Sequence, residues 1–141
     1  MGNSFVIKGN ICQTINSKEL DLHENSYAVC VDGISKGVFD ALPEEYASLP
    51  FFDYGDKLVF PGMVDLHIHA PQYAFRGMCM DLELMEWLNQ YTFPEEEKYE
   101  NLEYAEKAYG MFVDAFKKSA TTRSCIFATR HRPATELLMK M

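Results

Sequence analysis

Two histidines at positions 67 and 69 have the residue type and spacing best suited to chemistry in this chain. They end an apolar segment, residues 63–68, that is interrupted only by Asp65 and His67. This pattern predicts a strand covered on both faces. Side chains two residues apart on a strand point the same way, so His67 and His69 project together. Two neutral imidazoles on one face can share a metal ion, and zinc is the natural occupant.

The same pair also fits a role without a metal. Two histidines at the end of a strand can equally be hydrogen-bonded to neighbouring groups or solvated. The spacing leaves both interpretations open, and the surrounding residues have to decide between them.

The residues that follow the pair alternate helical and strand patterns. Asp81 is predicted to N-cap a helix that Phe93 and Pro94 close, and Pro94 is predicted to open a longer, amphipathic helix. A strand is expected over residues 121–128 and a further helix over 133–141. The apolar stripe of the longer helix recurs at three-to-four spacing. Its members are Leu102, Ala105, Tyr109, Phe112, Val113 and Phe116.

The first sixty residues have β character instead. Four segments rich in β-branched and aromatic residues are bounded by Gly, Asn, Asp and Ser. Asp32 and Gly33 predict a hairpin turn that leads into an apolar run over 37–39, and residues 43–47 suit one helical turn. The four segments are residues 5–8, 10–15, 27–31 and 57–60.

We therefore expect an α/β fold in two parts, a small β domain over residues 1–61 and βα units over 62–141. Strand, helices, strand and helix in that order are typical of a parallel sheet or barrel. The second part has only 80 residues, whereas a complete (β/α)8 barrel needs about 250. The barrel is accordingly predicted to be truncated here.

The amino-acid composition limits the classes of binding partner that this chain is expected to have. The 141 residues carry 13 Lys and Arg against 21 Asp and Glu, a formal net charge of −8, which argues against nucleic acid and membrane surfaces as partners. The four cysteines form no CxxC pair, so free thiols in a reducing compartment are expected. With no signal peptide and no apolar run of membrane-spanning length, a cytoplasmic location is predicted.

The segment PGMVDLHIHA at residues 61–70 resembles the first barrel strand of the amidohydrolase superfamily. Within it, the continuation HAPQY, then DLELMEWL, YTFPE and FAT followed by His131, is similar to the guanine deaminase family. The resemblance covers about residues 60–131. One departure is Ser119-Ala120 before Thr121-Thr122, where the family commonly has Gly-Thr-Thr.

The resemblance implies a zinc-dependent hydrolase that converts guanine and water to xanthine and ammonia. It implies that His67 and His69 ligate Zn²⁺ and that residues His69, Ala70, Pro71 and Gln72 bind the substrate. The Gln72 amide carries a donor and an acceptor, which can match a purine edge. The catalytic residues are expected beyond Met141, so these residues alone are predicted to be inactive.

Other residues near the motif are expected to have packing, surface or loop-shaping roles. Trp87, the only tryptophan, is expected in the core rather than in the pocket. Phe75 and Arg76 are candidates for shaping the substrate loop, with Arg76 on the surface. His131 is expected in a solvated loop at the rim of the site. The run of acids at residues 95–97 is expected to be structural, at a helix start.

Two alternatives stay open. The chain can belong to another amidohydrolase, of chlorohydrolase or cytosine-deaminase type, although the His-Ala-Pro-Gln continuation argues against it. It can also be a non-catalytic remnant that acts as an assembly module. An exposed parallel strand edge recruits another chain, so a homo-oligomer is expected with either function.

Overall fold

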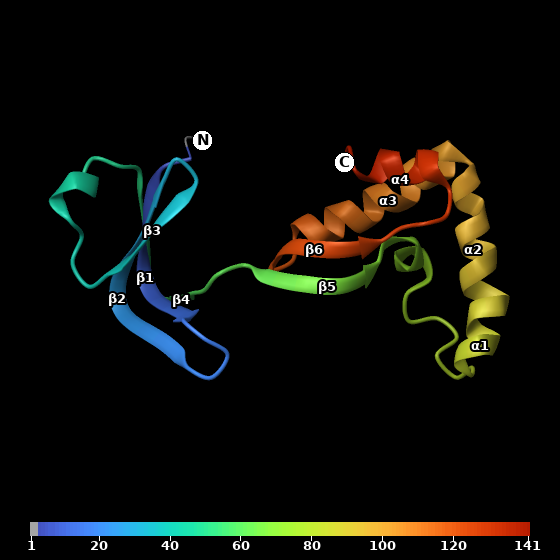
Figure 1. Cartoon of the computed structure of the whole chain (residues 1–141), viewed down its shortest axis with the longest axis horizontal. Helices are drawn as coiled ribbons and strands as arrows, with labels where there is room; N and C mark the ends of the chain where they lie inside the picture. Colours follow the sequence, from blue (N-terminus) through green and yellow to red (C-terminus); the bar gives the residue numbers. More distant parts are fainter. Residues whose placement is uncertain (1–2) are drawn as a thin grey trace. The chain divides into compact units, whose positions relative to one another are not determined.

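The computed structural model describes residues 3–141, and the chain forms two compact units, residues 1–61 and 62–141 (Figure 1). The first unit is a four-stranded sheet in the order β3-β2-β1-β4. Strand β1 pairs antiparallel with β2 and parallel with β4, and β2 pairs antiparallel with β3. Its strands are β1 (Phe5–Thr14), β2 (Leu20–Val31), β3 (Ile34–Phe39) and β4 (Phe51–Val59), with a 3₁₀ turn at Glu44–Tyr46.

The strands of this unit are longer than the sequence predicts. The segments 5–8 and 10–15 form one strand, β1, whose register shifts between Gly9 and Ile11. A Cβ on Gly9 would lie 2.8 Å from Val59 Cγ2, so glycine allows β4 to approach. The predicted hairpin is present, because Asp32 and Gly33 both have positive φ in the two-residue loop that joins β2 to β3.

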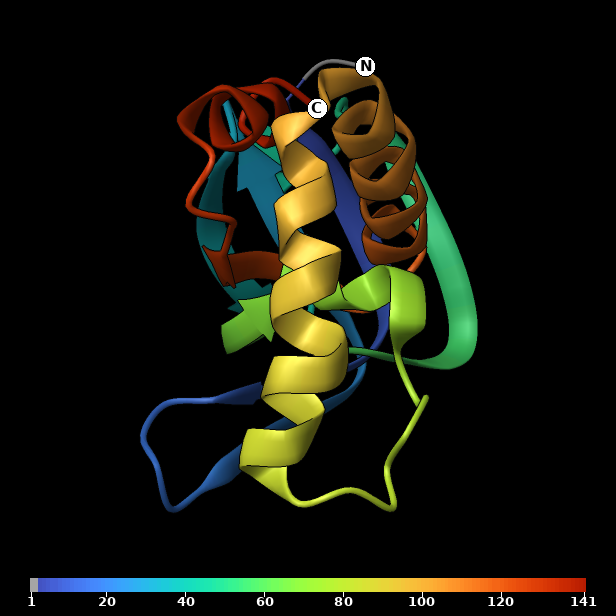
Figure 2. The ribbon, with the colours of Figure 1, turned by 90° about the vertical axis from the view of Figure 1, so that its right-hand side faces the viewer.

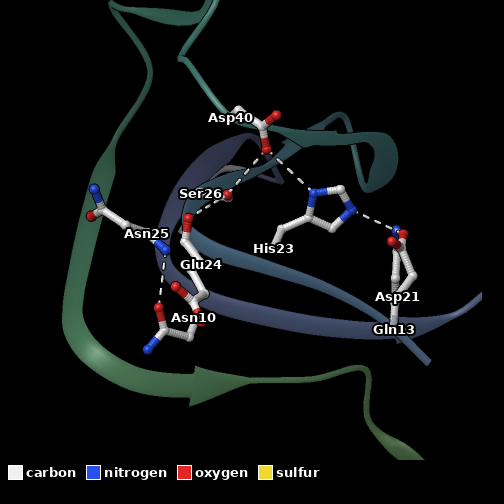
Figure 3. Close-up of polar contacts among 8 residues, drawn as sticks. All are labelled: Asn10, Gln13, Asp21, His23, Glu24, Asn25, Ser26 and Asp40. Carbon is white, nitrogen blue, oxygen red and sulfur yellow. Dashed lines mark hydrogen bonds and ion pairs between the residues drawn. The ribbon is translucent and has the colours of Figure 1, made fainter.

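A polar cluster ties β2 to the end of β3 (Figure 3). His23 Nε2 lies 2.9 Å from Asp21 Oδ2, and His23 Nδ1 lies 3.3 Å from Asp40 Oδ1. Gln13 of β1 donates to the same Asp21 oxygen at 2.9 Å. Hydrogen bonds to Asp21 and then Asp40 raise the pKa of His23, and those from Gln13 and then His23 lower the pKa of Asp21.

The second unit is a βα unit in which β5 (Met63–His69) pairs in parallel with β6 (Thr121–Phe127). The α/β expectation is confirmed by this parallel pair with its intervening helices. Those helices are a 3₁₀ turn (Ala70–Phe75), α1 (Leu84–Trp87), a π turn (Leu88–Thr92), α2 (Phe93–Glu97), a 3₁₀ turn (Lys98–Glu100) and α3 (Leu102–Lys117), and α4 (Arg132–Leu138) follows β6.

Two predicted helix boundaries are wrong. Glu83, not Asp81, precedes α1. Pro94 does not separate two helices, since α1, the π turn and α2 form one column (Figure 2). Phe93 N–H donates to Leu88 O across the π turn, and this wider turn accommodates a proline that cannot donate.

The longer helix begins later than predicted, at α3, where Asn101 is the N-cap. Its Oδ1 accepts hydrogen bonds from Glu103 N at 2.9 Å and Tyr104 N at 3.2 Å. At the other end, Ser119 Oγ donates to Phe116 O at 2.8 Å, which satisfies a terminal carbonyl where the family commonly has glycine.

The core of the second unit lies between α3, α4 and the turn after β5. Of the predicted stripe, Val113 and Phe116 pack against this core, whereas Leu102 is exposed. Ile68 of β5 packs on it from the sheet. The buried members of this core are Ala70, Tyr99, Ala105, Ala108, Tyr109, Phe112 and Ala134.

Among residues 3–141 we find no helix long and apolar enough to cross a membrane.

We expect the charge state of His23 to depend on both neighbouring carboxylates. The pKa of His23 is raised above its ordinary 6.5. The stabilisation that protonated His23 gives to the folded first unit is therefore complete below about pH 6.5 and is lost as pH rises through the raised pKa. An NMR titration should show that Asp21→Asn lowers this pKa more than Asp40→Asn does. Asp32→Asn, at the far end of β2, should leave it unchanged. Equal pKa values in all four proteins would contradict the role of the cluster.

We also expect Gly62→Ala to destabilise the second unit. A Cβ there would lie 2.7 Å from Thr122 Cβ and closer still to Thr122 Oγ1 and Cγ2, so β5 and β6 must shift, at about 1–3 kcal/mol. Denaturation followed by Trp87 fluorescence measures the free energy of unfolding of this unit. In the control Gly110→Ala, a Cβ on α3 meets nothing within 4 Å, and stability should rise by about 0.5–1 kcal/mol. Equal stability of the Gly62 variant and the unchanged chain would refute the constraint.

Candidate metal centre and ligand pocket

His67 and His69 converge at the carboxyl end of β5. Their Nε2 atoms lie 3.0 Å apart. Between Asp65 and Ile68 the register of β5 against β6 shifts by one residue, and Asp65 Oδ1 accepts a hydrogen bond from His67 N at 3.0 Å within this bulge. A bulge redirects side chains locally, so the strand end, together with its irregularity, sets where the two imidazoles point.

The pair of nitrogens fits either a hydrogen bond or a shared ion. Two nitrogens on one tetrahedral zinc ion lie about 3.3 Å apart, close to the distance observed. Partial burial, and then the charge of His67, lower the pKa of His69, which favours the neutral form that binds metals. No group of three or more His, Cys, Asp or Glu side chains within residues 3–141 could hold a metal ion. The donor set here is therefore two imidazoles.

Phe127, the last residue of β6, lies against both imidazoles. It is the register partner of His69. Its ring centroid is 4.8 Å from that of His69 with 14° between the planes, and 4.5 Å from that of His67 with 30°. No local sequence pattern marks Phe127 as part of the site, because only the pairing of β5 with β6 brings it to the histidines.

Gln72 lies in the turn after β5 and lines a cavity of about 470 Å³. The histidine pair does not line this cavity, although only two residues separate His69 from Gln72. The walls combine an amide, a guanidinium and an indole with apolar and sulfur-containing side chains. The other lining residues are Arg76, Gly77, Cys79, Met80, Leu82, Leu84 and Trp87.

The other two predicted substrate-binding residues, Ala70 and Pro71, are buried. Ala70 belongs to the core cluster, and Pro71 O accepts a hydrogen bond from Tyr99 Oη at 3.2 Å. Their side chains therefore hold the turn against the helices, and Gln72 is the first residue after them that faces the cavity.

The aromatic and basic residues of the loop divide between packing and surface. Trp87 is half-buried; its ring centroid lies 5.6 Å from that of Phe75, and its Nε1 donates to Met78 O at 3.3 Å. It thus lines the cavity and lies outside the core cluster where it was expected. Arg76 is exposed as expected, with its guanidinium carbon 3.9 Å from the Tyr73 ring centroid.

The side chain of His131 contacts Glu97 and not the histidine pair. Its side chain is 15% exposed, with Nε2 4.0 Å from Glu97 Oε2, so the expected solvated position is wrong. Glu97 also pairs with Arg130. These contacts join the segment before α3 to the segment after β6.

The three acids at residues 95–97 lie in different environments. Glu95 is buried, 2.6 Å from Lys98 Nζ, and accepts a hydrogen bond from Tyr104 Oη. Burial, and then this bond, raise the pKa of Tyr104 to about 12. Burial also raises the pKa of Glu96. Glu95 thus anchors α2 to α3.

Comparison with known proteins identifies similar chains. Segments of this chain align with two curated guanine deaminases. The identity is 46% over 89 residues with the enzyme of Dictyostelium discoideum and 49% over 82 residues with that of Homo sapiens. These alignments cover 63% and 58% of this chain but 20% and 18% of the relatives. The chain thus spans about a fifth of the length of the curated relatives it matches.

A solved structure gives the same result over nearly the whole chain. The guanine deaminase from C. acetobutylicum, with bound guanine in its active site, superposes with a TM-score of 0.93 at 42% identity. The match covers 99% of this chain and 33% of that one. Residues 58–140, more than half of the chain, match the model of the amidohydrolase family. This match, together with the paired histidines at the end of β5, shows that the chain belongs to the amidohydrolase family.

Proposed function

We propose that this chain forms the N-terminal part of a zinc-dependent guanine deaminase, which hydrolyses guanine to xanthine and ammonia. The observation that carries the proposal is the convergence of His67 and His69 Nε2 at 3.0 Å, with His69 three residues before the cavity-lining Gln72. The guanine deaminases among its relatives support the choice of substrate.

His67 and His69 would hold the zinc ion through Nε2. When bound, zinc supplies the Lewis acidity that lowers the pKa of water towards neutrality. The chain's own contribution is to present two imidazoles together at the end of strand β5. A catalytic zinc site has three protein ligands and an open position, so one or more further ligands must come from residues outside 1–141.

Gln72 would bind the purine edge. Its amide offers one acceptor and two donors, and the cavity that it lines has room for a purine, with Trp87 as an apolar wall. Buried Ala70 and Pro71 fix the backbone that joins His69 to Gln72, so the metal ligand and the substrate contact keep a constant spacing.

For the whole protein, we propose that residues 62–141 are the first two βα units of a (β/α)8 barrel and that residues 1–61 are part of the small β domain. The carboxylate that transfers protons would also lie outside these residues. Within residues 3–141, β5 and β6 pair only with each other. Their outer edges can take up further strands or another copy of the chain.

We expect the 141-residue chain to bind zinc through the pair. His67→Ala and His69→Ala should each lower zinc affinity by at least about tenfold, the lower end of the loss seen when even an outer-shell partner is removed. Competition with a chromophoric chelator measures it. His23→Gln, a histidine of the first unit, serves as the control. Equal zinc affinity in the double variant and the unchanged chain would exclude the pair as ligands.

We expect guanine turnover only when the missing groups are supplied. The chain alone should form no xanthine with added zinc, because general acid–base catalysis contributes about 10²–10⁴-fold. A chimera that carries the remaining two thirds of the C. acetobutylicum enzyme should be active. Xanthine formation by the 141-residue chain alone would overturn the assignment of the missing groups. A zinc-loaded chimera that turns over cytosine but not guanine would favour the assignment of this chain to another amidohydrolase. A zinc-loaded chimera with no activity would favour the assembly-module alternative.

In that chimera, Gln72→Ala should weaken guanine use while leaving zinc bound. Loss of an amide partner to a buried polar group costs about 1–3 kcal/mol, which is about 5- to 150-fold in kcat/KM. Gln90→Ala is the matched control, since Gln90 is exposed and its amide donates to Glu86 on the same helical column. Unchanged kcat/KM for guanine in the Gln72 variant would remove Gln72 from the substrate site.

A further inference from the structure

We propose that Phe127 is a positioning residue that orients the imidazoles of His67 and His69 for metal binding, an inference that rests on the proposed function. The parallel register of β5 with β6 places Phe127 directly beside His69. Its ring lies nearly parallel to that of His69, at 14°, and at 30° to that of His67. One side chain thus contacts both metal-binding candidates.

The two imidazoles have no other orienting partner in the part of the chain that the structure describes. Metal-ligating histidines usually donate their second ring N–H to a carboxylate or carbonyl, which fixes the ring. Within residues 3–141 the only hydrogen bond of either ring is the one between the two Nε2 atoms. Asp65 bonds the backbone N–H of His67 and leaves its ring free.

Stacking is suited to the same task. A ring stacked on the face of an imidazole restricts its χ2 rotation, yet leaves the in-plane lone pair of Nε2 unobstructed. With the Phe127 ring against both imidazoles, the planes of His67 and His69 lie at 41° to each other and their Nε2 atoms lie 3.0 Å apart. Phe127 thus lies against each imidazole, with its ring stacked on that of His69 and tilted by 30° to that of His67.

Phe127 can be changed without disturbing the core. It is 44% exposed and lies outside the buried cluster around α3. Its neighbour Ile126 pairs with Ile68, which packs on that cluster, so Ile126 and Phe127 lie on opposite faces of β6. Ile126→Val is therefore a matched control that alters the same strand away from the histidines.

The test compares Phe127→Leu, Phe127→Tyr and Ile126→Val in the 141-residue chain. In the metal-free chain, the ring current of Phe127 should displace the NMR signals of the His67 and His69 ring protons. Phe127→Leu should abolish the displacement and Phe127→Tyr should preserve it. With zinc, Phe127→Leu should lower affinity by about tenfold, at the low end of losses for an outer-shell partner, whereas the other two variants should match the unchanged chain.

The two readouts separate this inference from the proposed function. Histidine signals that are the same in Phe127→Leu and the unchanged chain, or zinc affinity that is the same in both, would overturn the positioning role. If the unchanged chain shows the ring-current displacement but binds no zinc, the metal function fails, and with it the purpose assigned to Phe127. Trp87 fluorescence during denaturation verifies that each variant is folded.

Discussion

The parallel pairing of β5 with β6 is the interaction on which the second unit depends. It brings Phe127 beside His69 and Thr122 against Gly62, so one ladder of backbone hydrogen bonds sets both the packing at the start of the strands and the site at their end. The ladder is irregular, with register shifts after Met63 and after Asp65. Each irregularity lies beside one of these contacts, as expected where a bulge redirects side chains.

A second constraint keeps the loop after β5 in place. Ala70 and Pro71 are buried, Tyr99 Oη reaches back to Pro71 O, and Glu95 joins Lys98 to Tyr104. The long connection from His69 to α3 is therefore attached at both its beginning and its end. Between these attachments lies the cavity that Gln72 lines. In the proposed site, these attachments would hold the spacing between the histidine pair and Gln72.

The first unit has its own balance of polar and apolar contacts. Val6, Ile11 and Val29 are buried in its sheet, while His23 bridges two carboxylates at its margin. Edge strand β4 exposes large apolar side chains, among them Phe51 and Leu58. Because exposed apolar strand edges favour further pairing, this unit has a surface suited to additional strands, as the open edges of β5 and β6 also have.

The amino-acid sequence alone indicated the α/β character of residues 62–141, the histidine pair and the family resemblance, because periodicities of two and of three to four residues and a short motif are local properties. It also predicted the Asp32-Gly33 hairpin, since positive φ at both turn positions favours these residues. The continuation of the helix through Pro94, the half-buried position of His131 beside Glu97 and the contact of Phe127 with both histidines appear only in the folded chain. Those outcomes depend on a π turn and on contacts between segments far apart in the chain, and no local pattern records which distant residues will meet.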